Sequence, residues 1–265
     1  MSRIKKYGRT ACIAGASEGI GAAFSHYLAK EGYDLIVVAR RPEPMMALAK
    51  ELEGKYHVKV NTLAFDLSVP NAAKDLLAAV EPFEIDVLVY NAGLSYIGAF
   101  EKNDLNHHLE IARTNIMTPL ELVQTLGTKM LERNRGALVL MGSLAGLQGS
   151  GFLSTYAASK AFDTILAESL WYEWKDRGVD VIACVAGATS SPNFINTKPK
   201  KTGLIEPKVQ TPEEVVEECF ANLGKQPRII TGFANRLASF FMHRVLPRKW
   251  AIKIIGQTTR KMYGV

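Results

Sequence analysis

The chain has 265 residues, of which 48% are hydrophobic and 22% are charged, a composition that excludes disordered and collagen-like chains. Its net charge of +6 comes from the C-terminal segment, because residues 225–265 hold nine Lys or Arg and no acid, whereas the rest holds 23 Lys or Arg against 26 acids. No apolar run approaches the about 18 residues of a membrane span, and no signal-peptide pattern opens the chain, so we expect a cytoplasmic protein.

Strand-like and helix-like segments alternate over the first 185 residues. Apolar runs predict strands at residues 10–14, 34–39, 57–63, 85–90, 136–141 and 179–185. Apolar residues at helical spacing predict helices at residues 19–31, 42–53, 68–80 (capped by Ser68), 101–133 and 155–177. The alternation predicts an α/β fold, a doubly wound, Rossmann-like parallel sheet of about seven strands with helices on both faces.

The alternation of strands and helices breaks after residue 185. Residues 188–210 are rich in Ser, Thr, Pro, Asn and Lys, which is typical of a functional loop or of disorder. A capped helix is expected to begin at Thr211, and residues 228–231 predict an edge strand. No linker, repeat or low-complexity tract is found, so we expect one domain over residues 1–265, with a substrate loop and a basic C-terminal helical cap in residues 188–265.

A glycine-rich turn follows the first predicted strand and opens the first predicted helix. Gly15 and Gly19 permit a tight turn there, and Gly21 lets helix and strand pack closely. Because backbone N–H groups at a helix N-terminus bind phosphate, we predict a pyrophosphate site in this loop. The residues assigned to it are Gly15, Ser17, Glu18, Gly19, Ile20 and Gly21.

The second predicted strand ends in Ala39-Arg40-Arg41, without the Asp or Glu that would bind the ribose hydroxyls of NAD. The guanidinium of Arg40 would pair with a 2′-phosphate, so the sequence favours NADP(H), whereas Arg41 is expected to solvate the strand end. Asp66 and Leu67, after the third predicted strand, are expected beside the adenine, with capping as the other role open to Asp66.

Tyr156 and Lys160 lie early in a predicted helix, and their four-residue separation puts both on one face. A free tyrosine has a pKa of about 10. A nearby ammonium and an oxidised nicotinamide would stabilise its phenolate and make it a general acid/base. Alone, this pair is typical of a helix surface, and a mid-helix Asn115 is typical of a neutral surface residue. Ser143 and Asn91-Ala92-Gly93, however, follow neighbouring strands at the same predicted sheet edge.

In this order and spacing, these motifs resemble the short-chain dehydrogenases/reductases over about residues 10–191. The resemblance implies that Tyr156 is the general acid/base, that Lys160 holds the nicotinamide ribose and that Ser143 binds the substrate oxygen. It also implies that Asn115 supports a water-mediated proton relay. The reaction it implies is NADP(H)-dependent interconversion of a carbonyl and a secondary alcohol. The further cofactor contacts it implies are Asn91, Ala92, Gly93, Tyr156, Lys160, Gly187, Thr189 and Ser191.

Some positions depart from the family pattern without removing a reacting group. Ala14 stands where Thr is common, and Tyr90 replaces the first Asn of a common Asn-Asn-Ala-Gly run. The turn after the sixth predicted strand lacks the usual Pro-Gly. Ser191 falls at a position where Thr is usual, so either it or Thr189 is expected to bind the carboxamide.

Two other functions compete with this interpretation. A serine hydrolase using Ser143 is opposed by the absence of a G-x-S-x-G elbow and of a histidine in the sequence context of a base. A catalytically idle NADP(H)-binding sensor or scaffold would be expected to lack Ser143, Tyr156 or Lys160, and all three are present. The substrate pocket is expected from segments 94–100 and 144–152, the 188–210 loop and the C-terminal tail. Their apolar character indicates a medium or bulky hydrophobic ketone, a steroid-like compound or a 3-oxoacyl substrate.

The expected partners are a small-molecule substrate and, by family resemblance, further copies of the chain packed through the two long helices. Residues 236–262 admit three roles, namely contact with an anionic membrane surface, a cap on the substrate pocket, or two amphipathic helices packed on the core, which we favour. No nucleic-acid-reading motif is found. The His and Cys spacings match no metal site, and the three cysteines are expected to be reduced core residues.

Overall fold

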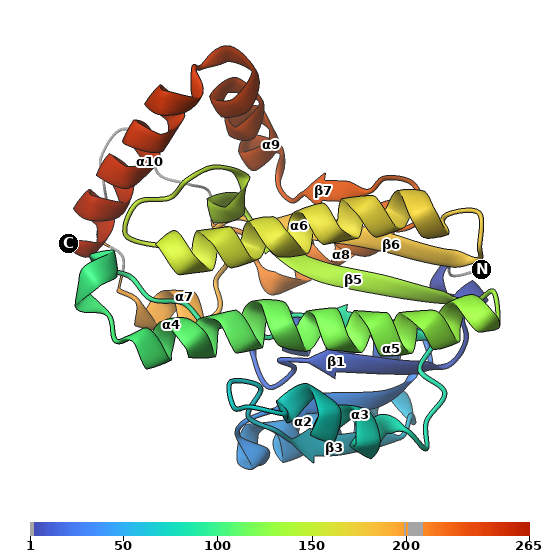
Figure 1. The fold of residues 1–265 in the computed structure, drawn as a ribbon. Coiled ribbons are helices and arrows are strands. Elements are labelled where there is room, and N and C mark those ends of the chain that lie inside the picture. The colour runs from blue at the N-terminus through green and yellow to red at the C-terminus, as the bar shows by residue number, and fades with distance from the viewer. Residues whose placement is uncertain (1–2, 199, 201–208) are drawn as a thin grey trace.

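The computed structural model describes residues 3–198, 200 and 209–265. Seven parallel strands form one sheet in the order β3-β2-β1-β4-β5-β6-β7. Figure 1 shows the sheet with β3 and β7 on opposite sides. The strand order reverses between β1 and β4, and doubly wound sheets bind ligands at that point, beyond the carboxyl ends of the strands. The strands are β1 (Thr10–Ala14), β2 (Asp34–Ala39), β3 (Val60–Ala64), β4 (Val87–Tyr90), β5 (Gly136–Ser143), β6 (Val179–Ala186) and β7 (Arg228–Ile230).

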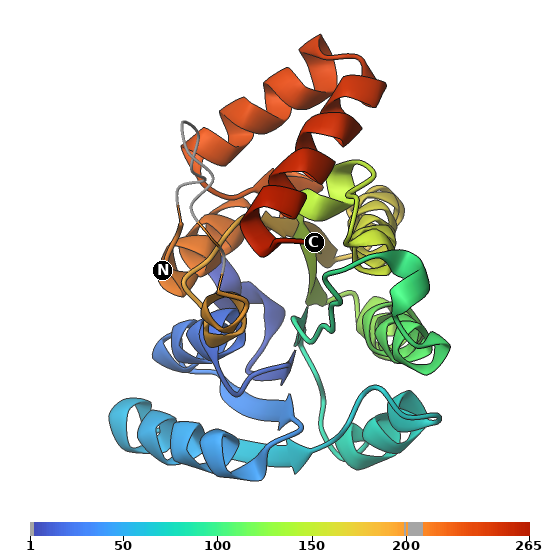
Figure 2. The same cartoon turned by 90° about the vertical axis from the view of Figure 1, so that its left-hand side faces the viewer.

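Helices cover both faces of this sheet, with α1, α2 and α8 on one face and α3, α5 and α6 on the other (Figure 2). Because side chains alternate along a strand, neighbouring residues such as Ile13 and Cys12 enter the two different cores. The doubly wound fold is therefore confirmed. The helices are α1 (Gly19–Lys30), α2 (Pro42–Tyr56), α3 (Ala72–Val80), α4 (Leu105–Ala112), α5 (Thr118–Glu132), α6 (Ser154–Trp174), α7 (Pro192–Asn196), α8 (Pro212–Asn222), α9 (Phe233–Phe240) and α10 (Arg248–Tyr263).

The predicted cap of the third helix is wrong. The Ser68 hydroxyl and backbone N–H both donate to Asp66 Oδ1, at 2.6 and 2.9 Å, so this serine belongs to a turn. The chain then passes through Asn71 in the left-handed conformation, with φ 66°, and α3 begins at Ala72. Local side-chain bonding to the backbone therefore competes successfully with helix initiation at Ser68.

The long helix predicted over residues 101–133 is interrupted. A short 3-10 turn at Phe100–Lys102 comes first, and α4 begins directly after Asp104. The Asp104 carboxylate caps this helix by accepting from the Asn106 N–H. Between α4 and α5, residues Arg113–Met117 form a π-helical turn. Such a turn accommodates one extra residue and is frequent at functional sites. Asn115 lies in the middle of it and is fully buried.

Two residues of the segment after β6, Thr189 and Gln210, pair in an isolated parallel bridge. The short helix α7 lies within the loop predicted over residues 188–210, while residues 199 and 201–208 of that loop lie outside the described residues. The expected start of the next helix is confirmed, since Thr211 and Glu214 form a reciprocal capping box. The predicted edge strand is β7.

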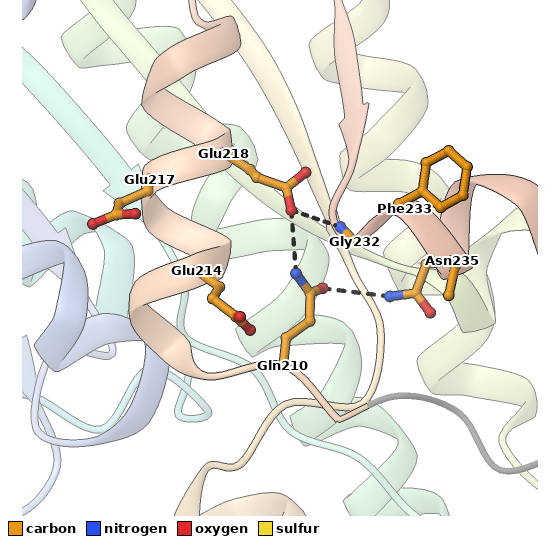
Figure 3. Close-up of a pocket in the computed structure, with 8 residues that line it drawn as sticks. Gln210, Glu214, Glu217, Glu218, Gly232, Phe233 and Asn235 are labelled. Atoms are coloured by element: carbon orange, nitrogen blue, oxygen red, sulfur yellow. Dashed lines mark hydrogen bonds between the residues drawn. The ribbon is translucent and has the colours of Figure 1, made fainter.

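The last two helices stand outside the two layers that cover the sheet, and we call residues 233–263 the C-terminal arm (Figures 1 and 2). Figure 3 shows how its root is held: Glu218 accepts from the Gly232 N–H at 2.9 Å, and the side-chain amide of Gln210 contacts both Glu218 and Asn235. At its far end Arg260 lies over the ring of Phe152, 5.1 Å from the centroid.

The expectation that both arm helices pack their apolar residues on the core is wrong. Phe233 is 74% exposed and Trp250 is 54% exposed, although Ala251 and Thr259 of α10 are buried. Over the described ranges, each helix is too short or too polar to span a membrane. The other exposed apolar side chains of the arm are Leu237, Phe240, Phe241, Val245, Ile252 and Ile254.

A buried carboxylate joins two strands of the sheet at their amino-terminal ends. Asp86, just before β4, accepts from the backbone N–H groups of Arg9 and Thr10 at 2.7 and 3.0 Å. Its other oxygen contacts Arg135 at 3.4 Å. The first residues of β1 are therefore fixed to β4 by a side chain as well as by the strand pairing.

We predict that Asp86→Ala lowers the free energy of unfolding by about 2 kcal/mol, because two backbone donors lose their charged acceptor. Urea denaturation followed by circular dichroism measures the loss. Glu84→Ala is the matched control, since the exposed Glu84 also contacts Arg135 but holds no buried donor, and it should cost less than about 0.5 kcal/mol. Equal losses in the two variants would contradict the assigned role.

Candidate active site

The glycine loop is held between two strands at the point where the strand order reverses. The Gly15 N–H donates to the Val38 carbonyl, and Asn91 Nδ2 donates to the Gly15 carbonyl, both at 2.8 Å. A β-carbon on Gly15 would lie 2.6 Å from the Ala92 nitrogen, and one on Gly21 would lie 1.9 Å from the Gly15 oxygen. These glycines therefore permit an approach that side chains would block, and the N-terminus of α1 opens where a pyrophosphate could bind.

The strand ends beside this loop carry the residues predicted to face the adenosine. Arg40 is exposed at the end of β2. Burial raises the pKa of Asp66, but hydrogen bonds from Ser68 and the charge of Arg40 outweigh it and lower this pKa overall. Leu67 is buried, and its carbonyl accepts from Thr118 at 3.3 Å. Contact of Asp66 and Leu67 with the adenine stays a prediction.

Arg41 does more than solvate the end of β2. Its guanidinium lies 2.6 Å from Glu18 Oε2, so it joins the strand end to the glycine loop. Both partners are partly exposed, and such a pair contributes little stability by itself. Its position places a positive charge directly at the predicted phosphate loop, a contact that the sequence pattern had not indicated.

The three predicted reacting groups come from β5 and the first turns of α6. Ser143 ends β5, and its hydroxyl accepts from the Ala145 N–H at 3.3 Å. Tyr156 is half-buried in the first turn of α6, and Lys160 is buried one turn later. The Lys160 ammonium donates to the Met141 carbonyl of β5 at 2.8 Å, which draws it to the same sheet edge as Ser143.

Asn115 clamps three segments together. Its Oδ1 accepts from the Leu94 N–H at 2.8 Å, and its Nδ2 donates to the Leu94 carbonyl and to Ser159 Oγ, both at 2.9 Å. The π-helical turn, the loop after β4 and helix α6 are thereby joined. Since both amide donors are used, the side chain acts here as a clamp, and the predicted role of Asn115 in a proton relay stays a prediction.

Tyr90 is a residue whose contribution the sequence analysis missed. It is fully buried, and its hydroxyl donates to the carbonyl of Thr114 in the π-helical turn. Burial, with a smaller contribution from Asp163, raises its pKa well above the ordinary value, so it remains a neutral donor. The signal in the sequence was its departure from the family pattern Asn-Asn-Ala-Gly.

A second missed contact lies beside Tyr156. The hydroxyl of Thr155 and Nδ1 of His108 are 2.7 Å apart, and His108 Nε2 lies 3.2 Å from the Phe100 carbonyl. The imidazole also stacks on the ring of Phe100, with centroids 4.5 Å apart. Helix α4 is thereby fixed to the start of α6. The sequence around His107 and His108 gives no signal for such a role.

The two residues considered for carboxamide binding lie in different surroundings. A β-carbon on Gly19 would lie 2.8 Å from Ser191 Cβ, so Ser191 stands against the glycine loop. Thr189 is buried and donates to the Gly187 carbonyl at 3.1 Å. Of the two, Ser191 is therefore the one next to the predicted cofactor site, although its role stays a prediction.

The arrangement brings a phenol, an ammonium and a serine hydroxyl to strand ends near the glycine loop, and such a set of groups suits proton transfer to a carbonyl oxygen. Ser143 contacts a backbone N–H rather than a histidine, which opposes the hydrolase alternative. In the part of the chain that the structure describes, no three His, Cys, Asp or Glu side chains gather as metal ligands.

Comparisons with known proteins agree with this geometry. The family model of the short chain dehydrogenases matches residues 9–202. The 7beta-hydroxysteroid dehydrogenase of Clostridium sardiniense is 34% identical over 236 residues, which cover 89% of this chain and 90% of that protein. A solved 7beta-hydroxysteroid dehydrogenase has a TM-score of 0.91 at 29% identity, covering 97% of this chain and 100% of the other. A short-chain dehydrogenase from Sphingobium yanoikuyae, solved with NADPH, has a TM-score of 0.76 at 26% identity, covering 88% and 92%.

We predict that Gly21→Ala weakens NADPH binding at least about tenfold, a loss of about 1.4 kcal/mol. The added methyl group would collide with the Gly15 carbonyl and displace Asn91 from it. Titration of nucleotide fluorescence measures the affinity. Gly54→Ala, in α2 with open space around the new methyl group, is the control and should bind normally. Unchanged affinity in folded Gly21→Ala would contradict the proposed loop.

Proposed function

Since the chain belongs to the short-chain dehydrogenase family, we propose that it is an NADP(H)-dependent oxidoreductase that interconverts a carbonyl and a secondary alcohol. The observation that carries the proposal is the buried Lys160 one turn beyond Tyr156, drawn to the end of β5 where Ser143 lies. A catalytically idle sensor would have no need to bury an ammonium beside a tyrosine, because burial of a charge is costly.

The chain's own residues would move the proton. Ser143 would hold the substrate oxygen by a hydrogen bond, and Tyr156 would give its phenolic proton to that oxygen as a carbonyl is reduced. Lys160 would bind the ribose of the cofactor and stabilise the phenolate that remains. The bound nicotinamide supplies the hydride. In oxidation, Tyr156 would take the proton back from the alcohol.

The basic residues near the glycine loop support NADP(H) as the cofactor. Arg40 is exposed beside the predicted adenosine site, where the guanidinium can pair with a 2′-phosphate. Arg41 is paired with Glu18, so Arg40 is the arginine of this pair that is proposed to meet the 2′-phosphate. The Sphingobium protein binds NADPH with the same fold. Reduction is the expected direction with this cofactor.

The C-terminal arm supports a bulky hydrophobic substrate. A β-carbon on Gly151 would lie 3.4 Å from Gly256 of α10, and Arg260 covers Phe152, so the arm adjoins the loop that follows Ser143. We assign it the role of a cap on the substrate pocket, contributing apolar surface and positive charge. A hydrophobic ketone of steroid size fits this surface and the similarity to a hydroxysteroid dehydrogenase, and a 3-oxoacyl chain is the second candidate.

Exposed apolar side chains also run along the two long helical stretches, from α4 to α5 and on α6. Because these side chains occur on both long helical stretches, they support the homo-oligomer through these helices that the family resemblance implies. They are Leu109, Met117, Leu120, Ile165 and Tyr172.

The buried free cysteines suit a reducing compartment, and we place the protein in the cytoplasm as one domain. Membrane contact through the arm stays a prediction, supported by its exposed Trp250 beside basic residues.

We predict that Tyr156→Phe lowers carbonyl reduction at least about 100-fold, because the proton donor is lost. NADPH oxidation, followed by absorbance with a panel of hydrophobic ketones, measures the rate. Tyr172→Phe is the matched control, since this exposed tyrosine lies on the same helix, and it should react normally. NADPH affinity should change less than about threefold in both variants. Full activity in Tyr156→Phe would refute the assigned acid/base.

We predict that Arg40→Ala raises the KM for NADPH at least about tenfold, with little change in the KM for NADH, because only NADPH carries the 2′-phosphate. Initial rates with each cofactor and one ketone measure the two constants. Arg9→Ala, at an exposed arginine beside the start of β1, controls for general loss of positive charge. Parallel changes for both cofactors would show that Arg40 does not select between them.

A further inference from the structure

The ammonium of Lys160 has a carboxylate partner on its own helix. Asp163 Oδ2 lies 3.0 Å from Lys160 Nζ, and the side chains are 1% and 5% exposed. The Met141 carbonyl takes a second N–H of the same ammonium at 2.8 Å. An ammonium has three donors, so one remains for a ligand. A β-carbon on Gly93 would lie 3.7 Å from Nζ, which shows that the ammonium lies close to the end of β4, beside the predicted cofactor site.

Only one of the two carboxylate oxygens of Asp163 has a hydrogen-bond partner among the described residues. Its Oδ1 is buried and has no hydrogen-bond partner among the described residues. Burial is the main cause that raises the pKa of Asp163, with Lys160 acting against it. Burial lowers the pKa of Lys160, but the negative charge of Asp163, followed by Tyr156, raises it overall. Each partner therefore favours the charged form of the other, and a buried pair of this kind is lost at high cost when one member is removed.

The charged and titratable groups around this pair are few. Helix α6 presents Lys160 and Tyr156, and β4 presents the buried Tyr90, whose pKa is raised by burial and by Asp163. Strand β5 presents the Met141 carbonyl, an uncharged acceptor. The π-helical turn presents the uncharged Asn115 and its neighbour Thr114. Within the part of the chain described, Asp163 is thus the carboxylate that compensates the ammonium.

We propose that Asp163 is a positioning residue that fixes the ammonium of Lys160 and sets the pH range in which Tyr156 stays protonated. The inference rests on the proposed function. An uncompensated ammonium would stabilise the phenolate of Tyr156 strongly, whereas a carboxylate 3.0 Å behind that ammonium cancels part of the effect. The protonated phenol is the form that would give its proton to a carbonyl oxygen, so the carboxylate would favour reduction.

Asp163→Asn tests this assignment, since the amide keeps the shape and one acceptor oxygen but removes the charge. The midpoint of the acidic limb of kcat/KM for alcohol oxidation should fall by about one pH unit, because the phenolate forms more readily. Asp163→Glu keeps the charge and should keep the midpoint even if kcat falls. Glu168→Gln is the control, since Glu168 lies half-buried further along the same helix, where it pairs with Arg228. A midpoint that stays or rises in folded Asp163→Asn, or that falls equally in Asp163→Glu, overturns the proposal.

A second measurement needs no substrate and separates this inference from the proposed activity. The tyrosinate absorbance is titrated in two NADP⁺-bound proteins, one that has Tyr156 and one that carries Tyr156→Phe. The difference between the two curves gives the ionisation of Tyr156 alone. In the Asp163→Asn background this ionisation should move to lower pH by about one unit. If the unsubstituted protein shows no turnover but the spectroscopic shift appears, the proposed activity is rejected and the role of Asp163 is retained. If Asp163→Asn does not move the ionisation of Tyr156, the role of Asp163 is rejected.

Discussion

The close approach of the glycine loop to the end of β4 is the constraint on which the candidate site depends. The bond from Asn91 to the Gly15 carbonyl and the lack of a side chain on Gly21 bring the start of α1 to the reversal point of the sheet. The reacting groups reach the same edge through a second set of bonds, from Lys160 to β5 and from Asn115 to the loop after β4. The glycine loop and the predicted reacting groups are thus positioned by the same few strand ends.

The parts of this arrangement that follow from local sequence pattern could be predicted. Apolar strands, amphipathic helices and the glycine turn depend on residues close in the chain, so the sheet and the place of the glycine turn before α1 were expected correctly. The π-helical turn around Asn115 could not be predicted, because helical periodicity barely changes when one residue bulges out. Arg41 with Glu18, and Tyr90 with Thr114, are contacts between distant segments that no spacing reveals.

The C-terminal arm shows a different limit of such prediction. Its helical pattern was clear, but a pattern of apolar residues does not say which surface they meet. We expected the core, and the structure leaves Phe233 and Trp250 largely in solvent while Ala251 and Thr259 are buried. The arm is held at its root by the polar contacts of Gln210 and Glu218. Polar anchoring therefore determines its direction, and its apolar face is left for a ligand or partner.

Asp86 secures the start of β1 at the edge of the sheet that faces away from the strand ends bearing Ser143 and Tyr90. The stability of the fold and the proposed chemistry therefore depend on residues at opposite ends of the same strands. A substitution at Asp86 can therefore lower the fraction of molecules that are folded while leaving every residue of the candidate site in place.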